Sequence, residues 1–464
     1  MTYDLKPYAN CKDSGVSWLG KIPTHWDIKS GFAAYREKHE KNIGLIEKTV
    51  LSLSYGRIII KPPEKLHGLV PESFETYQVI NPGDVIIRAT DLQNDQNSLR
   101  VGLARDRGII TSAYLCLRPT GLLSSEYGYY VLHAYDLAKI FYGMGSGLRQ
   151  NLSFRDIKRM PVIVPPDDEQ RAIAWFLDHF NRHIDHYIHL KKKRITLLNE
   201  QKQAVINQAV SCGLDPNVQL KTSGIPWLGD IPEHWETRRI KYLIREADCR
   251  STTGSETLLS MRMHHGLVPF AEHFTRPPQS ATLVGFKVVL PGQIVVNRMQ
   301  AGNGLIFASR LKGLVSPDYA VFDPLGDVNV EYLGELFRSR KVRAKFRAES
   351  KGLGTGTSGF LRLYNDRLGA IPVALPPRPE QDAILERLSE QLHNVNASIA
   401  TTEREIELIR EYRIRLITDV VTGRFDVREA AANLPEEVDE PVESLEGDEA
   451  IEEDPEMLVT EAGA

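Results

Sequence analysis

The chain has 464 residues, of which 42% are hydrophobic and 25% are charged, a composition typical of a globular protein with two or more domains. Its four cysteines are scattered without a CxxC pair, which argues against a zinc site and a disulfide framework and favours a reducing, cytoplasmic setting. The N-terminus lacks an apolar run before a cleavage site, and no stretch approaches the roughly 18 apolar residues of a membrane span, so we expect neither export nor membrane insertion.

The net charge of -4 conceals two oppositely charged regions. Residues 429–464 contain fourteen acidic and no basic residues, and we predict that this tail is disordered. The rest of the chain has 57 basic against 47 acidic residues, a net charge of +10. A basic body favours a polyanionic partner.

Two motifs occur twice in the chain. The opening motif reads KDSGVSWLGKIPTHW at residues 12–26 and KTSGIPWLGDIPEHW at residues 221–235, with ten of fifteen positions identical. A PPxxEQ motif follows at residues 165–170 and again at residues 376–381. The sequence is therefore a tandem duplication of a unit of about 210 residues.

Each repeat begins with short, β-branched-rich runs bounded by Gly, Pro and Asn, a pattern typical of strands. A segment with helical spacing follows them. We predict two α+β domains with strands at 49–54, 57–60, 77–80, 84–89 and 109–117 and a helix at 126–141 in the first, and strands at 288–290, 293–297 and 314–322 and a helix at 330–348 in the second.

A long helix is predicted after each PPxxEQ motif. Apolar residues recur at intervals of three, four and seven from Glu169 to Gly213 and from Glu380 to Gly423. Such a narrow apolar seam needs a partner helix, and we expect the two helices to form an antiparallel coiled coil that separates the globular domains. The predicted segments are 1–166 (first domain), 167–213 (first helix), 214–377 (second domain), 378–424 (second helix) and 429–464 (tail).

The opening motif combines Lys, His and Trp and could contact DNA. Trp, Pro and Gly more often fix packing and turns, so we assign the motif to structure, as a clamp that holds each N-terminal segment on its domain or helix end.

Candidate DNA-binding residues lie in polar loops. Arg and Lys suit guanine, and Asn and Gln suit adenine. One set follows equivalent strands in the two halves, with Arg88 aligned to Asn297, although such loops are commonly just solvated. A second set lies in glycine-rich loops whose backbone amides could approach phosphates, and flexible surface turns explain these loops equally well. The first set comprises Arg88, Gln93, Asn94, Arg100, Asn297, Arg298 and Gln300, and the second comprises Arg149, Gln150, Asn151, Lys351 and Thr355. Arg262 and His264 belong to a further candidate cluster.

The opening motif, the PPxxEQ motif and the VTGxxD-like helix ending together resemble the specificity subunit of Type I restriction-modification systems, over residues 12–428. The resemblance implies two target-recognition domains that alternate with two conserved helical regions. It also implies a non-catalytic subunit that reads a bipartite, asymmetric site in double-stranded DNA, with each domain reading one half. The implied partners are two modification subunits, which use S-adenosylmethionine, and restriction subunits, which use ATP and Mg; no cofactor is implied for this chain.

Two other functions compete with this interpretation. A self-contained methyltransferase or nuclease would need a catalytic motif, but the chain has Lys61-Pro62-Pro63-Glu64 and Arg276-Pro277-Pro278-Gln279 where an amino-methyltransferase has Asn-Pro-Pro-Tyr or Asp-Pro-Pro-Tyr. No paired-carboxylate nuclease signature is evident either. A coiled-coil scaffold that binds only proteins is disfavoured by the basic body and by the two large domains.

Overall fold

The computed structural model describes residues 5–62, 73–93, 95, 98–144, 151–215, 217–263, 265–274, 278, 280–353 and 360–435. The chain forms two compact units. Unit 1 comprises Met1–Lys192 and Arg404–Ala464, and unit 2 comprises Lys193–Glu403. The unit boundaries therefore fall inside the two long helices, α4 (Asp167–Cys212) and α9 (Arg378–Val421), and each unit contains part of both.

The two units are built on the same four-stranded antiparallel sheet. In unit 1 the strand order is β4 (Tyr35–Lys38), β11 (Leu115–Pro119), β8 (Val85–Ile87) and β9 (Val101–Leu103). In unit 2 the order is β16 (Ile244–Glu246), β23 (Tyr319–Pro324), β20 (Ile294–Asn297) and β21 (Ile306–Ala308). The structure thus confirms the α+β class and the internal repeat.

Smaller antiparallel pairs and short helices surround each sheet. Unit 1 contains β1 (Cys11–Asp13) with β2 (Lys21–Pro23), β3 (Asp27–Ser30) with β12 (Pro161–Val164), β5 (Leu51–Ser54) with β6 (Arg57–Ile60), β7 (Gln78–Ile80) with β10 (Gly108–Ile110), α1 (Gly31–Ala34), η2 (Phe74–Thr76), α2 (Ser125–Leu137), η3 (Ile140–Gly143), α3 (Phe154–Arg159) and α10 (Arg428–Ala432). Unit 2 contains β13 (Leu220–Thr222) with β14 (Asp230–Pro232), β15 (Glu236–Arg239) with β26 (Pro372–Leu375), β17 (Leu259–Arg262) with β18 (Gly266–Pro269), β19 (Lys287–Val289) with β22 (Gly313–Val315), β24 (Lys351–Leu353) with β25 (Phe360–Arg362), η4 (Ile240–Tyr242), α5 (Phe270–His273), η5 (Ala301–Asn303), α6 (Val330–Arg338), α7 (Arg340–Glu349) and α8 (Asn365–Ala370).

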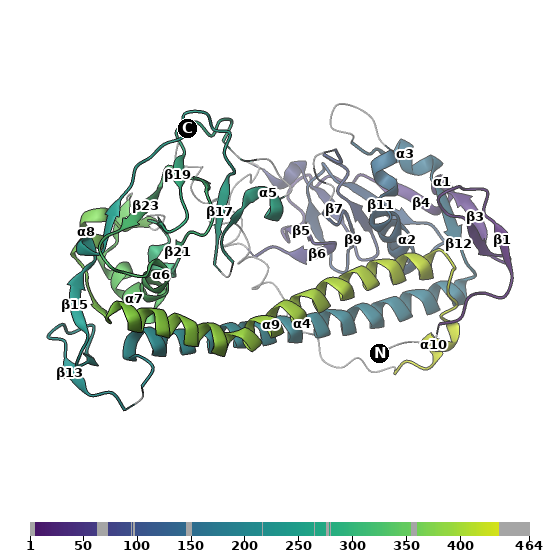
Figure 1. Ribbon diagram of the computed structural model, residues 1–464. Helices are drawn as coiled ribbons and strands as arrows, with labels where there is room; N and C mark the ends of the chain where they lie inside the picture. The colour runs from purple at the N-terminus through teal and green to yellow at the C-terminus, as the bar shows by residue number, and fades with distance from the viewer. Residues whose placement is uncertain are drawn as a thin grey trace. The chain divides into compact units, whose positions relative to one another are not determined.

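Helices α4 and α9 lie side by side and run antiparallel (Figure 1). In unit 1, Asp185 pairs with Arg413 and Lys191 pairs with Glu405 at 2.6 Å. In unit 2, Lys202 donates to the amide oxygen of Asn396 at 2.9 Å. Later residues of α4 thus meet earlier residues of α9, as the apolar seams predicted.

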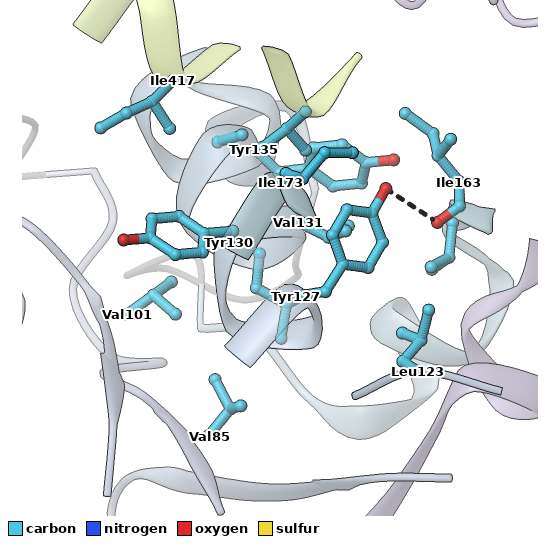
Figure 2. Packing of buried hydrophobic residues seen from close by; sticks show 14 of the residues in the cluster. Val85, Val101, Leu123, Tyr127, Tyr130, Val131, Tyr135, Ile163, Ile173 and Ile417 are labelled. Carbon is cyan, nitrogen blue, oxygen red and sulfur yellow. Dashed lines mark hydrogen bonds between the residues drawn. The ribbon is translucent and has the colours of Figure 1, made fainter. Parts of the chain in front are cut away.

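The hydrophobic core of unit 1 draws on both ends of the chain. Tyr127 and Val131 of α2 pack with Ile173 of α4 and Ile417 of α9, and the Tyr127 hydroxyl donates to the Ile163 carbonyl at 3.4 Å (Figure 2). The core of unit 2 instead uses the C-terminal part of α4 and the N-terminal part of α9. Each globular domain is therefore completed by helix segments from both repeats.

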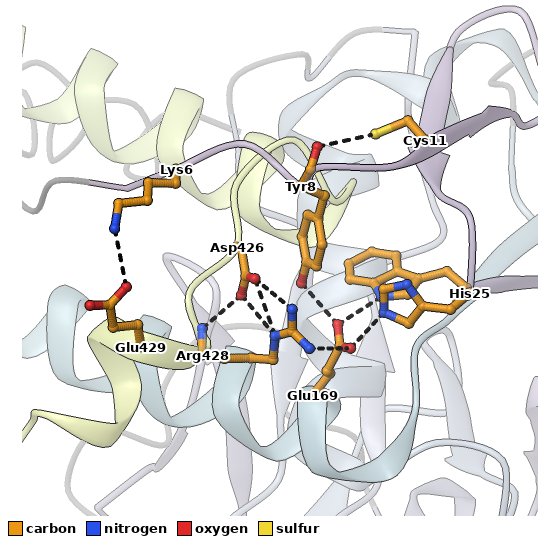
Figure 3. Close-up of polar contacts among 9 residues, drawn as sticks. Lys6, Tyr8, Cys11, His25, Glu169, Asp426, Arg428 and Glu429 are labelled. Carbon is orange, nitrogen blue, oxygen red and sulfur yellow. Dashed lines mark hydrogen bonds and ion pairs between the residues drawn. The ribbon is translucent and has the colours of Figure 1, made fainter.

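The PPxxEQ glutamate holds the opening motif in place in both units. In unit 1, Glu169 accepts from Trp26 at 2.8 Å and from Tyr8 at 2.9 Å, and it pairs with His25 at 2.6 Å (Figure 3). In unit 2, Glu380 contacts Trp235 at 3.1 Å and His234 at 2.7 Å. The structural assignment of the opening motif is confirmed.

The following glutamine fixes the start of a helix in the globular domain. Gln170 accepts from the backbone N–H of Ser124, the N-cap of α2, at 2.9 Å. Gln381 accepts from the N–H of Asn329, the N-cap of α6, at 2.8 Å. The PPxxEQ motif thus joins the long helix to the opening motif through Glu and to the domain through Gln.

Four predicted elements are wrong in extent. The helix predicted at 126–141 ends at Leu137, and the left-handed Lys139 separates it from the 3-10 helix η3. Segments 109–117 and 314–322 each form two strands because tight turns close at Thr111 and at Ser316, whose carbonyls accept from Tyr114 and Tyr319. The predicted helix at 330–348 is broken at Ser339, which is extended; the next amide, of Arg340, donates to the Asn207 side chain of α4. This break depends on a tertiary contact that local spacing does not reveal.

The predicted tail also begins too early. Helix α10 covers Arg428–Ala432, and Ala431 is buried in the core of unit 1. Residues 436–464 lie outside the described residues. Among the helices that the structure describes, none has the length and apolar character needed to cross a membrane.

Candidate nucleic-acid interface

Two structurally equivalent loops carry the main candidate residues. The first loop, residues 88–100, joins β8 to β9, and the second loop, residues 297–305, joins β20 to β21. At the base of the first loop the N–H of Arg88 donates to the Arg100 carbonyl at 2.8 Å. The N–H of Asn297 donates to the Leu305 carbonyl at 3.0 Å in the same way. Arg88 and Asn297 therefore occupy equivalent positions, as the alignment predicted.

A second segment meets each loop at an equivalent point. The N–H of Leu152 donates to the Ala89 carbonyl at 2.8 Å, and the N–H of Leu363 donates to the Arg298 carbonyl at 2.9 Å. These segments follow the glycine-rich loops singled out in the sequence. In unit 1 the contact brings Asn151 to the first loop, where its side-chain oxygen accepts from the N–H of Asp91 at 3.1 Å.

Arg100 is a structural residue of the first loop. Its side chain is 0% exposed and donates to the carbonyls of Arg88 (3.2 Å), Thr90 (2.7 Å), Asp91 (3.1 Å) and Asp95. Its Nε donates to the Tyr142 hydroxyl at 3.0 Å. The prediction that Arg100 reads bases is therefore not supported, because every direction of the guanidinium is used to hold the loop.

Asp136 of α2 also stabilises the first loop. Its carboxylate accepts from the backbone N–H of Arg100 at 2.7 Å. Burial raises the pKa of Asp136 to about 6, and this outweighs the opposing effects of the Arg100 amide and the Lys139 charge. The first loop is thus held by the buried Arg100 and by the carboxyl group of Asp136, whose ionisation is opposed by burial.

Other candidates of unit 1 remain accessible. Gln93 is exposed, and Arg88 is 36% exposed while it pairs with Asp95 at 3.3 Å. A partly exposed guanidinium held by one carboxylate can exchange that partner for a base or a phosphate. Asn94, Arg149 and Gln150 lie outside the described residues.

The candidates in the second loop all contact neighbouring groups. Asn297 is buried, and its side-chain oxygen accepts from the N–H groups of Met299 (3.1 Å) and Gln300 (3.3 Å), so it shapes the turn. Arg298 pairs with Glu246 at 2.6 Å, and the Gln300 side chain contacts Asn303. The second loop is shorter than the first, and buried Leu305 occupies the position equivalent to Arg100.

The remaining candidates lie on hairpins. Arg262 ends β17 and lies 5.3 Å from the Phe274 ring centre, and no contact among the described residues joins it to the second loop. Lys351 is exposed at the start of β24. His264 and Thr355 lie outside the described residues.

Sequence reasoning missed helix α7 as part of this region. Arg347 donates to the Gly302 carbonyl at 3.2 Å and to the Asn303 side chain at 2.9 Å, so α7 lies directly against the second loop. The signal was present, since five of the ten residues of α7 are Arg or Lys.

The structure thus presents a duplicated α+β domain on paired helices, with an equivalent polar loop between two strands of each sheet. Comparison with known proteins identifies its relatives. Residues 77–199, which include the first loop, match the family model described as Type I restriction modification DNA specificity domain. The chain is 23% identical over 443 residues to a putative type I restriction enzyme MjaX specificity subunit of Methanocaldococcus jannaschii, covering 88% of this chain and 96% of that protein. These findings confirm the resemblance to Type I specificity subunits.

A solved structure shares the fold. A chain from a type I R-M system, solved in a study of complex assembly and conformational transition, matches with a TM-score of 0.55 and 13% identity and covers 86% of this chain and 98% of that chain. The HsdS subunit from Thermoanaerobacter tengcongensis matches with 14% identity over 87% of this chain and 97% of that chain; its TM-score of 0.38 is too low to support an argument.

Proposed function

We propose that the chain is the sequence-specific DNA-recognition subunit of a Type I restriction-modification complex, and that each unit reads one half of a bipartite, asymmetric target. One observation carries the proposal. The DNA specificity domain match covers a loop that recurs at an equivalent position in unit 2 with different side chains. Equivalent loops with different residues are what two different half-sites require.

The side chains available in the loops suit base readout. Arg88 and Arg298 are each tethered by one carboxylate, and Gln93 is exposed. Arginine recognises guanine through two acceptors, and glutamine recognises adenine through an acceptor and a donor. The buried side chains of Arg100 in unit 1 and Asn297 in unit 2 hold the backbone of each loop in place, and base readout needs such a fixed backbone.

We further propose that α4 and α9 act as spacer and assembly platform for two modification subunits. Within unit 1 the two helices expose large apolar side chains, namely Tyr187, Leu190, Leu408, Tyr412 and Ile414. Apolar side chains in this number on a helix pair fit helices of a partner protein. Restriction subunits would join this complex for cleavage.

In this proposal the chain contributes recognition and no catalysis. The modification subunits would bind S-adenosylmethionine, and the restriction subunits would bind ATP and Mg. A methyltransferase or nuclease active in the isolated chain, or a scaffold that binds only proteins, would contradict it.

The test is a map of genome-wide adenine methylation after co-expression with the modification subunit. We expect one bipartite, asymmetric motif, and replacement of residues 27–164 or 236–375 by the equivalent segment of a relative should change only one half of it. An assembled complex that produces no motif, or a motif in which both halves change together, would refute the assignment of one unit to each half-site.

A further inference from the structure

Helix α7 of unit 2 carries a row of three arginines. Arg340, Arg343 and Arg347 are separated by three and four residues and therefore share one face of the helix. Lys345, on another face, pairs with Glu349 at 2.6 Å. Within the part of the chain that the structure describes, no carboxylate lies within ion-pair distance of the three arginines. We call these three residues the α7 arginine row.

The α7 arginine row holds the second loop through neutral groups. Arg343 and Arg347 both donate to the Gly302 carbonyl, at 3.5 Å and 3.2 Å, and Arg347 also donates to Asn303. A Cβ atom at Gly302 would lie 3.1 Å from the Cβ of Arg347, so glycine permits the close approach of loop and helix. Loop and row thus form one packed surface.

Among the described residues, no carboxylate neutralises the charge of the α7 arginine row. Burial lowers the pKa of Arg343, and the neighbouring charges of Arg347 and Arg338 lower it further. Carbonyl and amide oxygens orient a guanidinium but supply no net negative charge. An anion bound here would relieve the repulsion among the arginines.

Unit 1 is built differently at the equivalent place. The short helix η3 follows α2, and its Tyr142 contacts the first loop through a neutral hydroxyl, accepting from Arg100 and donating to the Asp95 carbonyl at 3.2 Å. The first loop is held by Arg100, which belongs to the loop itself. The second loop is held by Arg343 and Arg347, which belong to the neighbouring helix α7. The two units therefore differ in which element supplies the arginine that holds the loop.

We propose that the α7 arginine row contacts the phosphates of duplex DNA beside the second loop, so that one helix both positions the loop and binds the DNA backbone. This inference rests on the proposed function and deepens it. From Arg340 to Arg347 the helix rises about 10 Å, a length over which one DNA strand carries about three phosphates.

The test measures the affinity of the full chain for a mixed-sequence duplex by fluorescence anisotropy at salt concentrations between roughly 50 and 200 mM. A variant that makes one phosphate contact fewer than the wild type should show a slope of log affinity against log salt that is smaller by about 0.9. We expect this reduction for Arg340→Ala and Arg347→Ala, and about three times as much for the triple alanine variant. Arg310→Ala is the matched control, because Arg310 is 80% exposed in the same unit and pairs with Glu331 at 2.8 Å.

Arg347→Lys separates the two roles of Arg347. Lysine keeps the charge, so the salt slope should stay near that of the wild type, but it cannot donate to Gly302 and Asn303 in the same fork. In the methylation map this variant should relax only the half-site read by unit 2. Arg340→Ala serves if the triple variant fails to fold, because only the backbone N–H of Arg340 contacts Asn207.

The outcomes distinguish the two proposals. A wild-type chain without salt-dependent affinity for DNA refutes the proposed function itself. A wild-type chain that binds DNA, together with row variants whose salt slopes equal that of Arg310→Ala, overturns the role of the α7 arginine row alone.

Discussion

At the scale of single residues, the two PPxxEQ glutamates, Glu169 and Glu380, differ in burial and in the number of side chains that they bind. Glu169 is 3% exposed in its side chain and joins four partners, because Arg428 reaches it at 3.3 Å in addition to Tyr8, His25 and Trp26. Glu380 is 25% exposed and contacts only His234 and Trp235 among the described residues. Removing a buried carboxylate leaves its donors without partners, so the two glutamates should differ in importance.

We predict that Glu169→Ala lowers the free energy of unfolding of unit 1 by about 3–5 kcal/mol, because it leaves the buried Trp26 and Tyr8 donors without partners and removes one of the two carboxylates that pair with Arg428. Glu380→Ala should cost unit 2 about 1–2 kcal/mol. Urea unfolding followed by hydrogen exchange in peptides from each unit measures both. Equal losses in the two units would contradict the difference in burial.

Asp136 gives a pH-dependent prediction. Its pKa is raised to about 6 in the folded chain, so the folded state binds more protons than the unfolded state between about pH 4 and pH 6. The contribution of Asp136 to stability is present below that range and is lost as the pH rises through about 6. Asp136→Asn should therefore stabilise unit 1 relative to wild type at pH 8, with a gain that shrinks toward pH 4. Melting temperatures across this range check it, and a gain independent of pH would exclude the titration of Asp136 as its cause.

At the scale of elements, both long helices end at a left-handed glycine, as the sequence predicted, but the surroundings differ. A Cβ atom at Gly423 (φ 75°) would lie 2.8 Å from Trp26 and closer still to Pro23, whereas one at Gly213 (φ 79°) would lie 3.1 Å from Glu380. The end of α9 thus packs against the opening motif of unit 1, and the end of α4 packs against that of unit 2.

We predict that Gly423→Ala destabilises unit 1 by clearly more than the roughly 1 kcal/mol expected for a left-handed alanine alone. Gly20→Ala isolates that backbone cost, since Gly20 has φ 70° and no heavy atom would lie within 4 Å of the added Cβ. Gly213→Ala should fall between them. Thermal unfolding of the three variants gives the order, and a Gly423→Ala variant as stable as Gly20→Ala would contradict the close packing.

Features that depend on interactions between residues close in sequence were predictable, and features that depend on distant residues were not. Strand β6, the helix ends and the equivalence of Arg88 with Asn297 were predictable because periodicity, glycine and internal repetition are local signals. Arg100 was misassigned because an exposed and a buried arginine look alike in a sequence; only the carbonyls of residues 88–95 show its role. The break at Ser339 was missed for the same reason, because it depends on Asn207, which lies 133 residues before Arg340.

At the scale of the whole molecule, the first and the last described segments of the chain meet in unit 1. Lys6 forms an antiparallel bridge with Asp426, and Lys6 and Glu429 form an ion pair at 3.4 Å. Hydrogen bonding to Asp426 raises the pKa of Arg428, which also contacts Glu169. In unit 2 the corresponding region, residues 213–221, is a continuous piece of chain.

Ending the chain after residue 423 should therefore destabilise unit 1 and leave unit 2 unchanged, because it removes Val427 and Ala431 from the core together with Arg428. Ending it after residue 435 is the control and should leave both units unchanged. Hydrogen exchange in peptides from the two units reads out the result. Equal destabilisation of both units by the shorter chain would contradict the division of the molecule.

This arrangement also dictates an order of folding during synthesis. Unit 2 consists of the continuous segment Lys193–Glu403 and can form once that segment has left the ribosome. Unit 1 needs residues 404–435, so the strands of unit 1, which are made first, keep apolar faces uncovered until those residues have been synthesised. The half of the protein that is synthesised first is thus the half that folds last, and it is the half exposed longest to chaperones and proteases.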